Sequence, residues 1–217
     1  MSKKIAVILS GCGVFDGAEI HESVCTLLAI DKAGASSVCF APNINQHHVI
    51  NHITGEEMDE QRNVLIEASR IARGAINDLA DFDADEFDAV ILPGGFGAAK
   101  NLSDFAFEGA QATVNDDVKA ALQAMKRAQK PIGALCISPA VLAAVFGDVN
   151  VTIGSDAPTI SEIEACGATH TISEHEQIIV DGDNKIVTSP CYMFDASIGQ
   201  IAVGAEKTIN ALLELAA

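Results

Sequence analysis

Short apolar runs alternate with amphipathic segments along most of the chain. Apolar positions three and four apart predict helices over 21–35, 59–74, 116–129, 139–146 and 198–217. Runs rich in β-branched residues predict strands at 4–11, 37–42, 88–95, 131–136, 149–154 and 176–189. Strands separated by helices indicate βαβ units. The strands are apolar almost throughout, which predicts burial on both faces of a parallel sheet.

The sequence therefore predicts an α/β fold, a three-layer sandwich with a mostly parallel central sheet, formed as one domain over residues 1–217. Two segments are predicted to lie outside this framework. Residues 43–56 are polar and contain His47, His48 and His52, so they are expected to form a loop. The acidic stretch 78–88 is expected to be a surface connection.

Composition excludes several classes of protein. The formal net charge is −17, which argues against nucleic acids and anionic membrane surfaces as partners, because both require a basic patch. No apolar stretch approaches the ~20 residues that cross a bilayer. The cysteines form no CxxC pair, which fits neither a zinc site nor a secreted disulfide framework. We therefore expect no metal site and a cytoplasmic location.

Catalytic chemistry is expected beyond the carboxyl ends of the parallel strands, where such sheets place their sites. Cys136 lies there, between the strand at 131–136 and the helix at 139–146. A turn of this kind can hold a nucleophile above the sheet, and the start of the helix favours a thiolate. A buried structural cysteine fits the spacing equally well.

Other residues at the same edge are weaker candidates. Gly94 and Gly95 can direct backbone N–H groups at an oxyanion, or can serve only a tight turn. Glu19, His21 and Glu22 open the first helix, where an acid can carry protons or can simply favour the helix dipole. The histidines at 47, 48 and 52 are expected to be solvated. His170 and His175 are both possible bases, and the spacing does not choose between them.

Several segments together resemble the DJ-1/PfpI superfamily, a branch of the flavodoxin-like, class I glutamine amidotransferase-like fold. The segments are GAEIHES, LPGGFGAAKNLSDFA and GALCISPAVL. Further blocks, including SGCGVFDGAEIHE, RNVLIEASRIARG and DNKIVTSPCYM, are similar to the subgroup of enhancing lycopene biosynthesis proteins, which is regarded as glyoxalase-like. These blocks span nearly the whole chain.

The resemblance implies a role for individual residues. The reactive cysteine of the superfamily falls on Cys136, and the acid that hydrogen-bonds its sulfur falls on Glu22. The backbone donors near the sulfur fall on Gly94, Gly95 and Ile137. The resemblance also implies a homodimer.

One position departs from the superfamily. Many members have a histidine after the strand that follows the helix next to the reactive cysteine. At this position the present chain has Gly154, Ser155 and Asp156. A Cys-His-acid triad is therefore not expected, and neither is a glutaminase or protease.

The function expected from the resemblance is a cofactor-independent, glyoxalase-like lyase acting on a small dicarbonyl. A Cys136 thiolate would add to glyoxal, and a protonated Glu22, with His21 or His170 as an accessory group, would move a proton to give glycolate. Three alternatives stay open: a redox sensor based on Cys136, a stress-linked binding protein that retains the site as a relic, and a protein deglycase.

Overall fold

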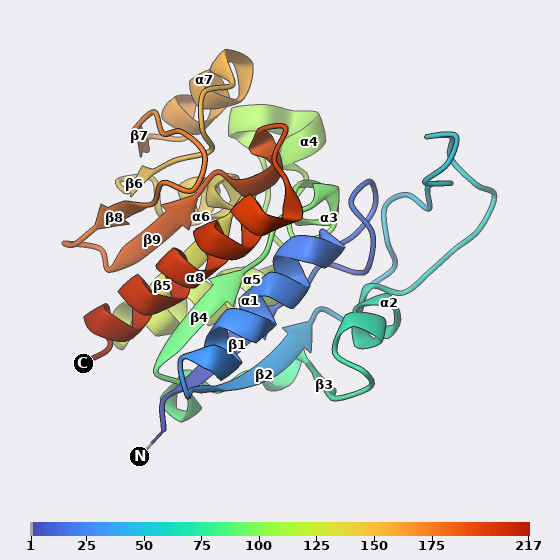
Figure 1. Ribbon diagram of the computed structural model, residues 1–217. Helices are drawn as coiled ribbons and strands as arrows, with labels where there is room; N and C mark the ends of the chain where they lie inside the picture. Colours follow the sequence, from blue (N-terminus) through green and yellow to red (C-terminus); the bar gives the residue numbers. More distant parts are fainter. Residues whose placement is uncertain (1) are drawn as a thin grey trace.

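The computed structural model describes residues 2–217, and its centre is one seven-stranded sheet (Figure 1). The strand order is β3-β2-β1-β4-β5-β9-β8. All neighbouring pairs are parallel except β8 and β9, which are antiparallel. The strands are β1 Lys4–Ile8, β2 Ser36–Ala41, β3 Ile76–Asp78, β4 Ala89–Leu92, β5 Ile132–Leu135, β8 Ile179–Asp181 and β9 Ile186–Ser189. The predicted α/β fold with a mostly parallel sheet is confirmed.

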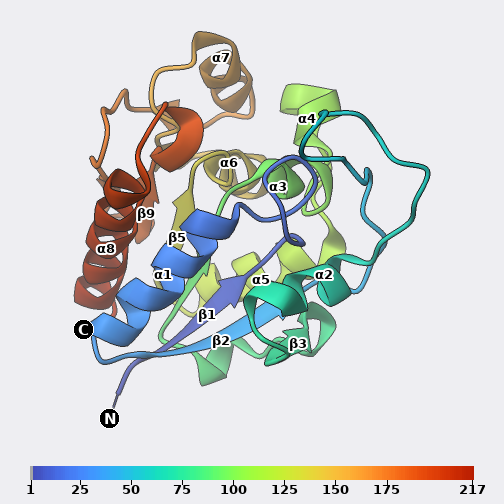
Figure 2. The same cartoon turned by 45° about the vertical axis from the view of Figure 1, so that its right-hand side comes forward.

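Helices cover both faces of this sheet (Figures 1 and 2). The α-helices are α1 Ile20–Lys32, α2 Val64–Ile71, α3 Phe96–Lys100, α4 Phe105–Glu108, α5 Asp116–Arg127, α6 Pro139–Phe146, α7 Ala157–Ala165 and α8 Ile198–Leu215. Short 3-10 helices lie at Leu79–Asp81, Ala84–Glu86, Gly109–Gln111 and Cys191–Met193. Among residues 2–217, no helix has both the length and the apolar character needed to cross a membrane.

The alternation of β1 side chains divides the core into two halves. Ile5 and Val7 pack in a cluster with α1, α2 and α8, whereas Ala6 and Ile8 pack on the opposite face with α3, α5 and α6. All four side chains are fully buried. This two-sided burial explains why the strands contain few polar residues.

Three predicted elements differ from the structure. The helix predicted over 59–74 begins only at Val64, because the Asn63 side chain accepts a hydrogen bond from the Ile66 N–H and caps it. The strand predicted over 149–154 is only β6, Asn150–Val151, which pairs with β7, Thr169–His170, in a separate two-stranded sheet. The acidic stretch 78–88 is not a plain surface connection, since Leu79, Ala84 and Phe87 are buried in the core.

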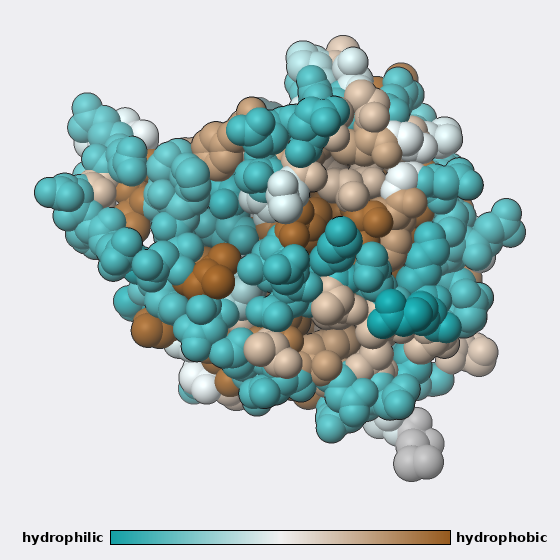
Figure 3. Space-filling view, turned by 180° about the vertical axis from the view of Figure 1, so that it is seen from behind, coloured by the Kyte–Doolittle hydropathy of each residue, from teal (hydrophilic) through white to brown (hydrophobic). Residues whose placement is uncertain are grey.

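The surface is predominantly hydrophilic, with smaller apolar patches, on the face opposite to the view of Figure 1 (Figure 3). The segment between β2 and α2 projects from one side of the molecule (Figures 1 and 2). On the opposite side, α7 lies with β6 and β7 beyond the end of the main sheet (Figures 1 and 2). These additions surround the carboxyl edge of the strands, where the site lies.

Candidate active site

Cys136 occupies a strained turn between β5 and α6. Its φ is +58°, in the left-handed region that costs a residue with a side chain roughly 1–2 kcal/mol. The turn is fixed by neighbouring hydrogen bonds: the Cys136 N–H donates to Ser189 O at 2.9 Å, and the Ser138 hydroxyl donates to Pro93 O at 2.7 Å. Strain that is held in place in this way is typical of functional sites. The strand-to-helix elbow expected around Cys136 is thus present.

The turn after β4 closes over the sulfur because Gly94 has no side chain. A Cβ added at Gly94 would lie 2.3 Å from Cys136 Cβ, 2.7 Å from Glu22 Oε2 and 3.0 Å from Cys136 Sγ. Gly95 follows with a φ of +95° and begins α3. Gly94 is therefore needed because the backbone lies close to Cys136 and Glu22, and Gly95 is needed because its backbone is left-handed.

Glu22 comes from the first turn of α1 and is fully buried. Its Oε2 accepts a hydrogen bond from the Gly94 N–H at 2.8 Å, and its Oε1 accepts one from the Tyr192 N–H at 3.1 Å. Glu19 is the N-cap of the same helix, and its carboxylate accepts the Glu22 N–H at 2.7 Å. Glu19 thus positions the start of α1, whereas Glu22 joins two turns that flank Cys136.

Burial controls the protonation of the pair formed by Glu22 and Cys136. Desolvation raises the pKa of Glu22 to about 7, against the lowering effect of hydrogen bonds from Tyr192, Gly94 and Cys136. Desolvation raises the pKa of the Cys136 thiol well above its ordinary value, and the negative charge of Glu22 raises it further. Hydrogen bonds from the N–H groups of Gly95 and Ile137 lower the pKa of the thiol in part. Burial is thus the largest cause of both shifts, and the two groups titrate as a coupled pair. The expected resting state, a thiolate beside a protonated Glu22, stays a prediction.

The Glu22 carboxyl is expected to make the folded protein less stable as pH rises. Its pKa is raised from 4.5 to about 7, so the unfolded chain loses this proton first and the stabilisation present below pH 4.5 is lost by about pH 7. The loss is on the order of 3 kcal/mol in the free energy of unfolding. Urea unfolding at pH 5 and pH 8 measures it, with Glu22→Gln as the comparison. Equal pH dependence in the two proteins would contradict the prediction.

A cavity of about 320 Å³ opens above the sulfur. Its wall is mainly apolar, and it is lined by Val14, Gly95, Phe96, Cys136, Ile137, Thr159, Tyr192 and Met193. Within the described part of the chain, these lining residues include no histidine. The cavity is large enough for a small organic molecule, and the Cys136 thiol lies in its wall.

The structure brings together most, but not all, of the expected site residues. Cys136, Glu22, Gly95 and Ile137 meet around the sulfur. Gly94 lies beside it, but its N–H is donated to Glu22 and is not free for an oxyanion. The expectation that Gly94 is an oxyanion donor is therefore wrong. Its role is to hold the carboxylate and to leave room for the thiol.

The two accessory histidines do not line the cavity. His21 is exposed on α1, and its Nδ1 lies 2.9 Å from the hydroxyl oxygen of Tyr192, a wall residue. His170 lies on β7, where its Nε2 accepts a hydrogen bond from the Ile153 N–H at 3.0 Å. The expectation of His170 as a base is wrong, because this nitrogen is bound to backbone in the small sheet. His175 packs against Phe194 and is also absent from the cavity wall.

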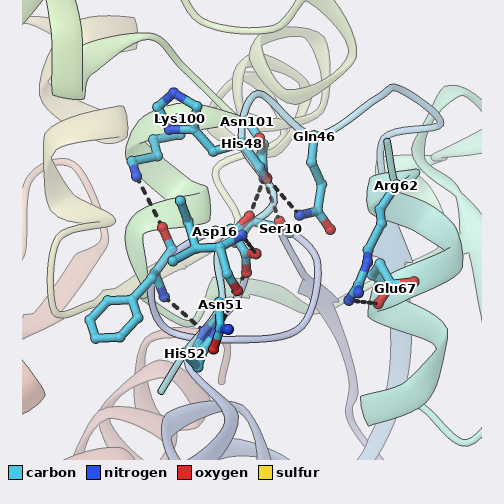
Figure 4. Close-up of polar contacts among 12 residues, drawn as sticks. Ser10, Asp16, Gln46, His48, Asn51, His52, Arg62, Glu67, Lys100 and Asn101 are labelled. Atoms are coloured by element: carbon cyan, nitrogen blue, oxygen red, sulfur yellow. Dashed lines mark hydrogen bonds and ion pairs between the residues drawn. The ribbon is translucent and has the colours of Figure 1, made fainter. Parts of the chain in front are cut away.

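The histidine-containing loop supports the segment that carries Val14 (Figure 4). His52 Nε2 accepts from the Phe15 N–H at 3.2 Å, and Asp16 accepts the Ile50 N–H at 2.7 Å. Asn101 donates to Ser10 O and Asp16 O, at 3.0 and 2.9 Å. Within residues 2–217, no group of three or more His, Cys, Asp or Glu side chains is arranged to hold a metal ion. The loop histidine His52 is thus structural rather than simply solvated.

Sequence patterns missed three wall residues, Thr159, Tyr192 and Met193. Thr159 lies on α7, which was not predicted, although Asp156 before Pro158 is a recognisable helix start. Tyr192 and Met193 lie in the short helix after β9, and the block DNKIVTSPCYM was noted only for its resemblance. No periodicity marks a single turn of this length.

Comparison with known proteins gives a family match over most of the chain. The model of the DJ-1/PfpI family matches residues 3–193. The human glutamine amidotransferase-like class 1 domain-containing protein 3, mitochondrial, is 44% identical over 98% of this chain and 83% of its own length. The ES1 protein homolog, mitochondrial, of Rattus norvegicus is 43% identical over 98% and 84%.

Solved structures agree with the observed fold. An isoprenoid biosynthesis protein with an amidotransferase-like domain from Ehrlichia chaffeensis superposes with a TM-score of 0.91 at 37% identity, covering 97% of this chain and 99% of that chain. Drosophila melanogaster DJ-1beta has a TM-score of 0.55 at 18% identity, covering 100% of this chain and 96% of that chain, and supports the fold alone.

The expected cytoplasmic location is contradicted by these relatives. The human and rat proteins, and the ES1 protein of Danio rerio at 35% identity over 88% of this chain, are mitochondrial proteins. The expectation rested on cysteines without a disulfide framework. Such cysteines argue only against an oxidising compartment and do not distinguish one reducing compartment from another.

Proposed function

The chain belongs to the DJ-1/PfpI family, and on that premise we propose that it converts small 2-oxoaldehydes, such as glyoxal, to 2-hydroxy acids without a metal or organic cofactor. The observation that carries the proposal is the contact between Cys136 and the buried Glu22 below an apolar cavity. A thiol beside a carboxyl with a pKa of about 7 provides a nucleophile and a proton carrier suited to neutral pH.

The first step is addition of Cys136 Sγ to one aldehyde carbon of glyoxal. Glu22 accepts the thiol proton as the carbon–sulfur bond forms and then gives it to the aldehyde oxygen, which leaves Glu22 as a carboxylate. The N–H groups of Gly95 and Ile137 face the sulfur and stabilise the negative charge that moves from sulfur to the aldehyde oxygen. The product of this step is a hemithioacetal.

The second step moves a proton between the two carbons. The Glu22 carboxylate removes the proton from the carbon attached to sulfur and, by way of an enediol, delivers it to the second carbon. The hydroxyl proton of the first carbon passes to the oxygen of the second carbon in the same rearrangement. The result is a thioester of glycolate. Water then cleaves the carbon–sulfur bond, releasing glycolate and restoring the thiol, so that one glyoxal and one water give one glycolic acid.

The redox-sensor alternative has less support from the geometry. A sensor cysteine is accessible and has a low pKa. Cys136 is only 7% exposed, and burial raises the pKa of its thiol. The homodimer, the stress-linked binding role and the protein deglycase all stay predictions.

The test is glycolate formation from glyoxal by the wild-type chain and by Glu22→Gln. Wild type is expected to form glycolate, and the variant to lose at least about 100-fold in kcat, because an amide cannot take up and release a proton as the carboxyl does. The amide oxygen can keep only one of the two backbone hydrogen bonds that the Glu22 carboxylate accepts. Glu67→Gln is the matched control, since Glu67 is a second buried carboxylate, paired with Arg70 outside the cavity. Full activity in Glu22→Gln would remove Glu22 from the mechanism.

A further inference from the structure

A second cavity adjoins the one above Cys136. Its volume is about 400 Å³, and three phenylalanines, Phe96, Phe105 and Phe107, lie in its wall. Phe96 and Phe107 are 48% and 44% exposed, which is unusual for side chains of this size. Large apolar side chains left exposed around a hollow mark a binding surface.

The two cavities share Phe96, Ile137 and Thr159 as lining residues. Ile137 directly follows the nucleophile, and its N–H faces the sulfur. A group attached to the carbon chain of a Cys136 adduct would therefore lie next to the second cavity, beside Ile137. Glyoxal has no such group, so it would leave this space unused.

The second cavity favours an uncharged group. Its single charged lining residue among those described is Glu162, whose Oε2 accepts a hydrogen bond from the Ala110 N–H at 2.8 Å. The same carboxylate packs against Gly109, where an added Cβ would meet it at 2.4 Å. The Glu162 carboxylate is thus already bound to backbone. The remaining wall offers aromatic and aliphatic surface.

Resting on the function proposed above, we propose that the preferred substrates are 2-oxoaldehydes with an aryl group, which the second cavity holds between Phe96 and Phe107. The dicarbonyl lies over Cys136, and the ring takes the place of water against the phenylalanine wall. Aromatic rings prefer offset or edge contacts with other rings, and these walls supply such surfaces. Phenylglyoxal, whose hydrolytic rearrangement gives mandelate, is the simplest member of this class.

The test compares the aryl and unsubstituted compounds in both turnover and binding. Wild type is expected to show a kcat/KM for phenylglyoxal roughly 10- to 100-fold above that for glyoxal. Mandelate is expected to bind wild type more tightly than glycolate in calorimetric titration. Ala106→Trp fills the second cavity from an exposed position and is expected to remove both advantages, leaving glyoxal turnover unchanged. Ala80→Trp, an exposed alanine outside both cavities, is the matched control.

The binding measurement separates this inference from the proposed reaction. If mandelate binds no better than glycolate, or if Ala106→Trp does not weaken it, the second cavity is not a substrate subsite, whatever the glyoxal rate. If no 2-oxoaldehyde is turned over but mandelate binding depends on Ala106, the reaction is wrong and the aryl site stands. Phe107→Ala provides an independent check, because loss of the ring is expected to weaken mandelate and not glycolate.

Discussion

Replacing Cys136 by serine is expected to lower glycolate formation from glyoxal by at least about 10³-fold, to the level of buffer alone. A hydroxyl has a far higher pKa than a thiol, and Glu22 with a pKa of about 7 is too weak a base to ionise it. Serine fits the same space, so the melting temperature is expected to change little. Glycolate is measured directly, with the variant shown to be folded by circular dichroism.

Cys166→Ser is the matched control for this loss. Cys166 is a partly exposed thiol at the end of α7, outside both cavities, and its replacement is expected to leave turnover unchanged. Wild-type activity that does not exceed that of Cys136→Ser would reject Cys136 as the nucleophile. The sensor and binding alternatives would then be the ones to pursue.

Gly94→Ala is expected to damage both the site and the stability of the fold. The new Cβ would lie 2.3 Å from Cys136 Cβ and 2.7 Å from Glu22 Oε2, so the turn after β4 must move. Overpacking of this kind costs on the order of 3 kcal/mol, or a melting temperature lower by about 6–12 °C for a chain of this size. Turnover is expected to disappear, because the Gly94 N–H no longer holds Glu22 beside the thiol.

Gly199→Ala makes the same chemical change where there is room. Gly199 lies in the first turn of α8, and the nearest atom to an added Cβ is Ser197 Oγ at 3.8 Å. This variant is expected to be at least as stable as wild type, because alanine favours the helix by up to about 1 kcal/mol. Thermal unfolding of the pair checks the difference. Equal melting temperatures for Gly94→Ala and wild type would show that the turn adapts without cost.

The parallel sheet and the elbow at Cys136 are predictable from local patterns. Four-residue apolar strands such as β5, followed by an apolar helix, determine where the cysteine lies. Glu22 is different, because an acid near a helix start has an ordinary explanation in the helix dipole. Its burial depends on Gly94 and Tyr192, which are 72 and 170 residues away in the chain. A contact between residues this far apart in the chain leaves no periodic signal. The pairing of Glu22 with Cys136 was therefore indicated only by the resemblance.

The two incorrect expectations about site residues share a physical cause. Gly94 was expected to point its N–H at an oxyanion, but backbone donors bind the nearest strong acceptor, and Glu22 is 2.8 Å away. His170 was expected as a possible accessory base, but β7 pairs with β6 outside the main sheet. In both cases the residue was identified and its partner was not. Partners are determined by packing across the whole fold.

The side chain of Asn101 gives the projecting loop a particular dynamic character. It accepts a hydrogen bond from the His47 N–H at 2.9 Å and donates to the backbone of Ser10 and Asp16. The Asn101 side-chain amide thus connects, through these hydrogen bonds, the base of the loop to the segment that carries Val14 of the cavity wall. Breaking it exposes three backbone groups at once, so these segments open as one cooperative unit. We therefore expect the protected amides around residues 10–18 and 46–52 to show similar opening free energies in hydrogen exchange, with the base of the loop opening together with the cavity wall.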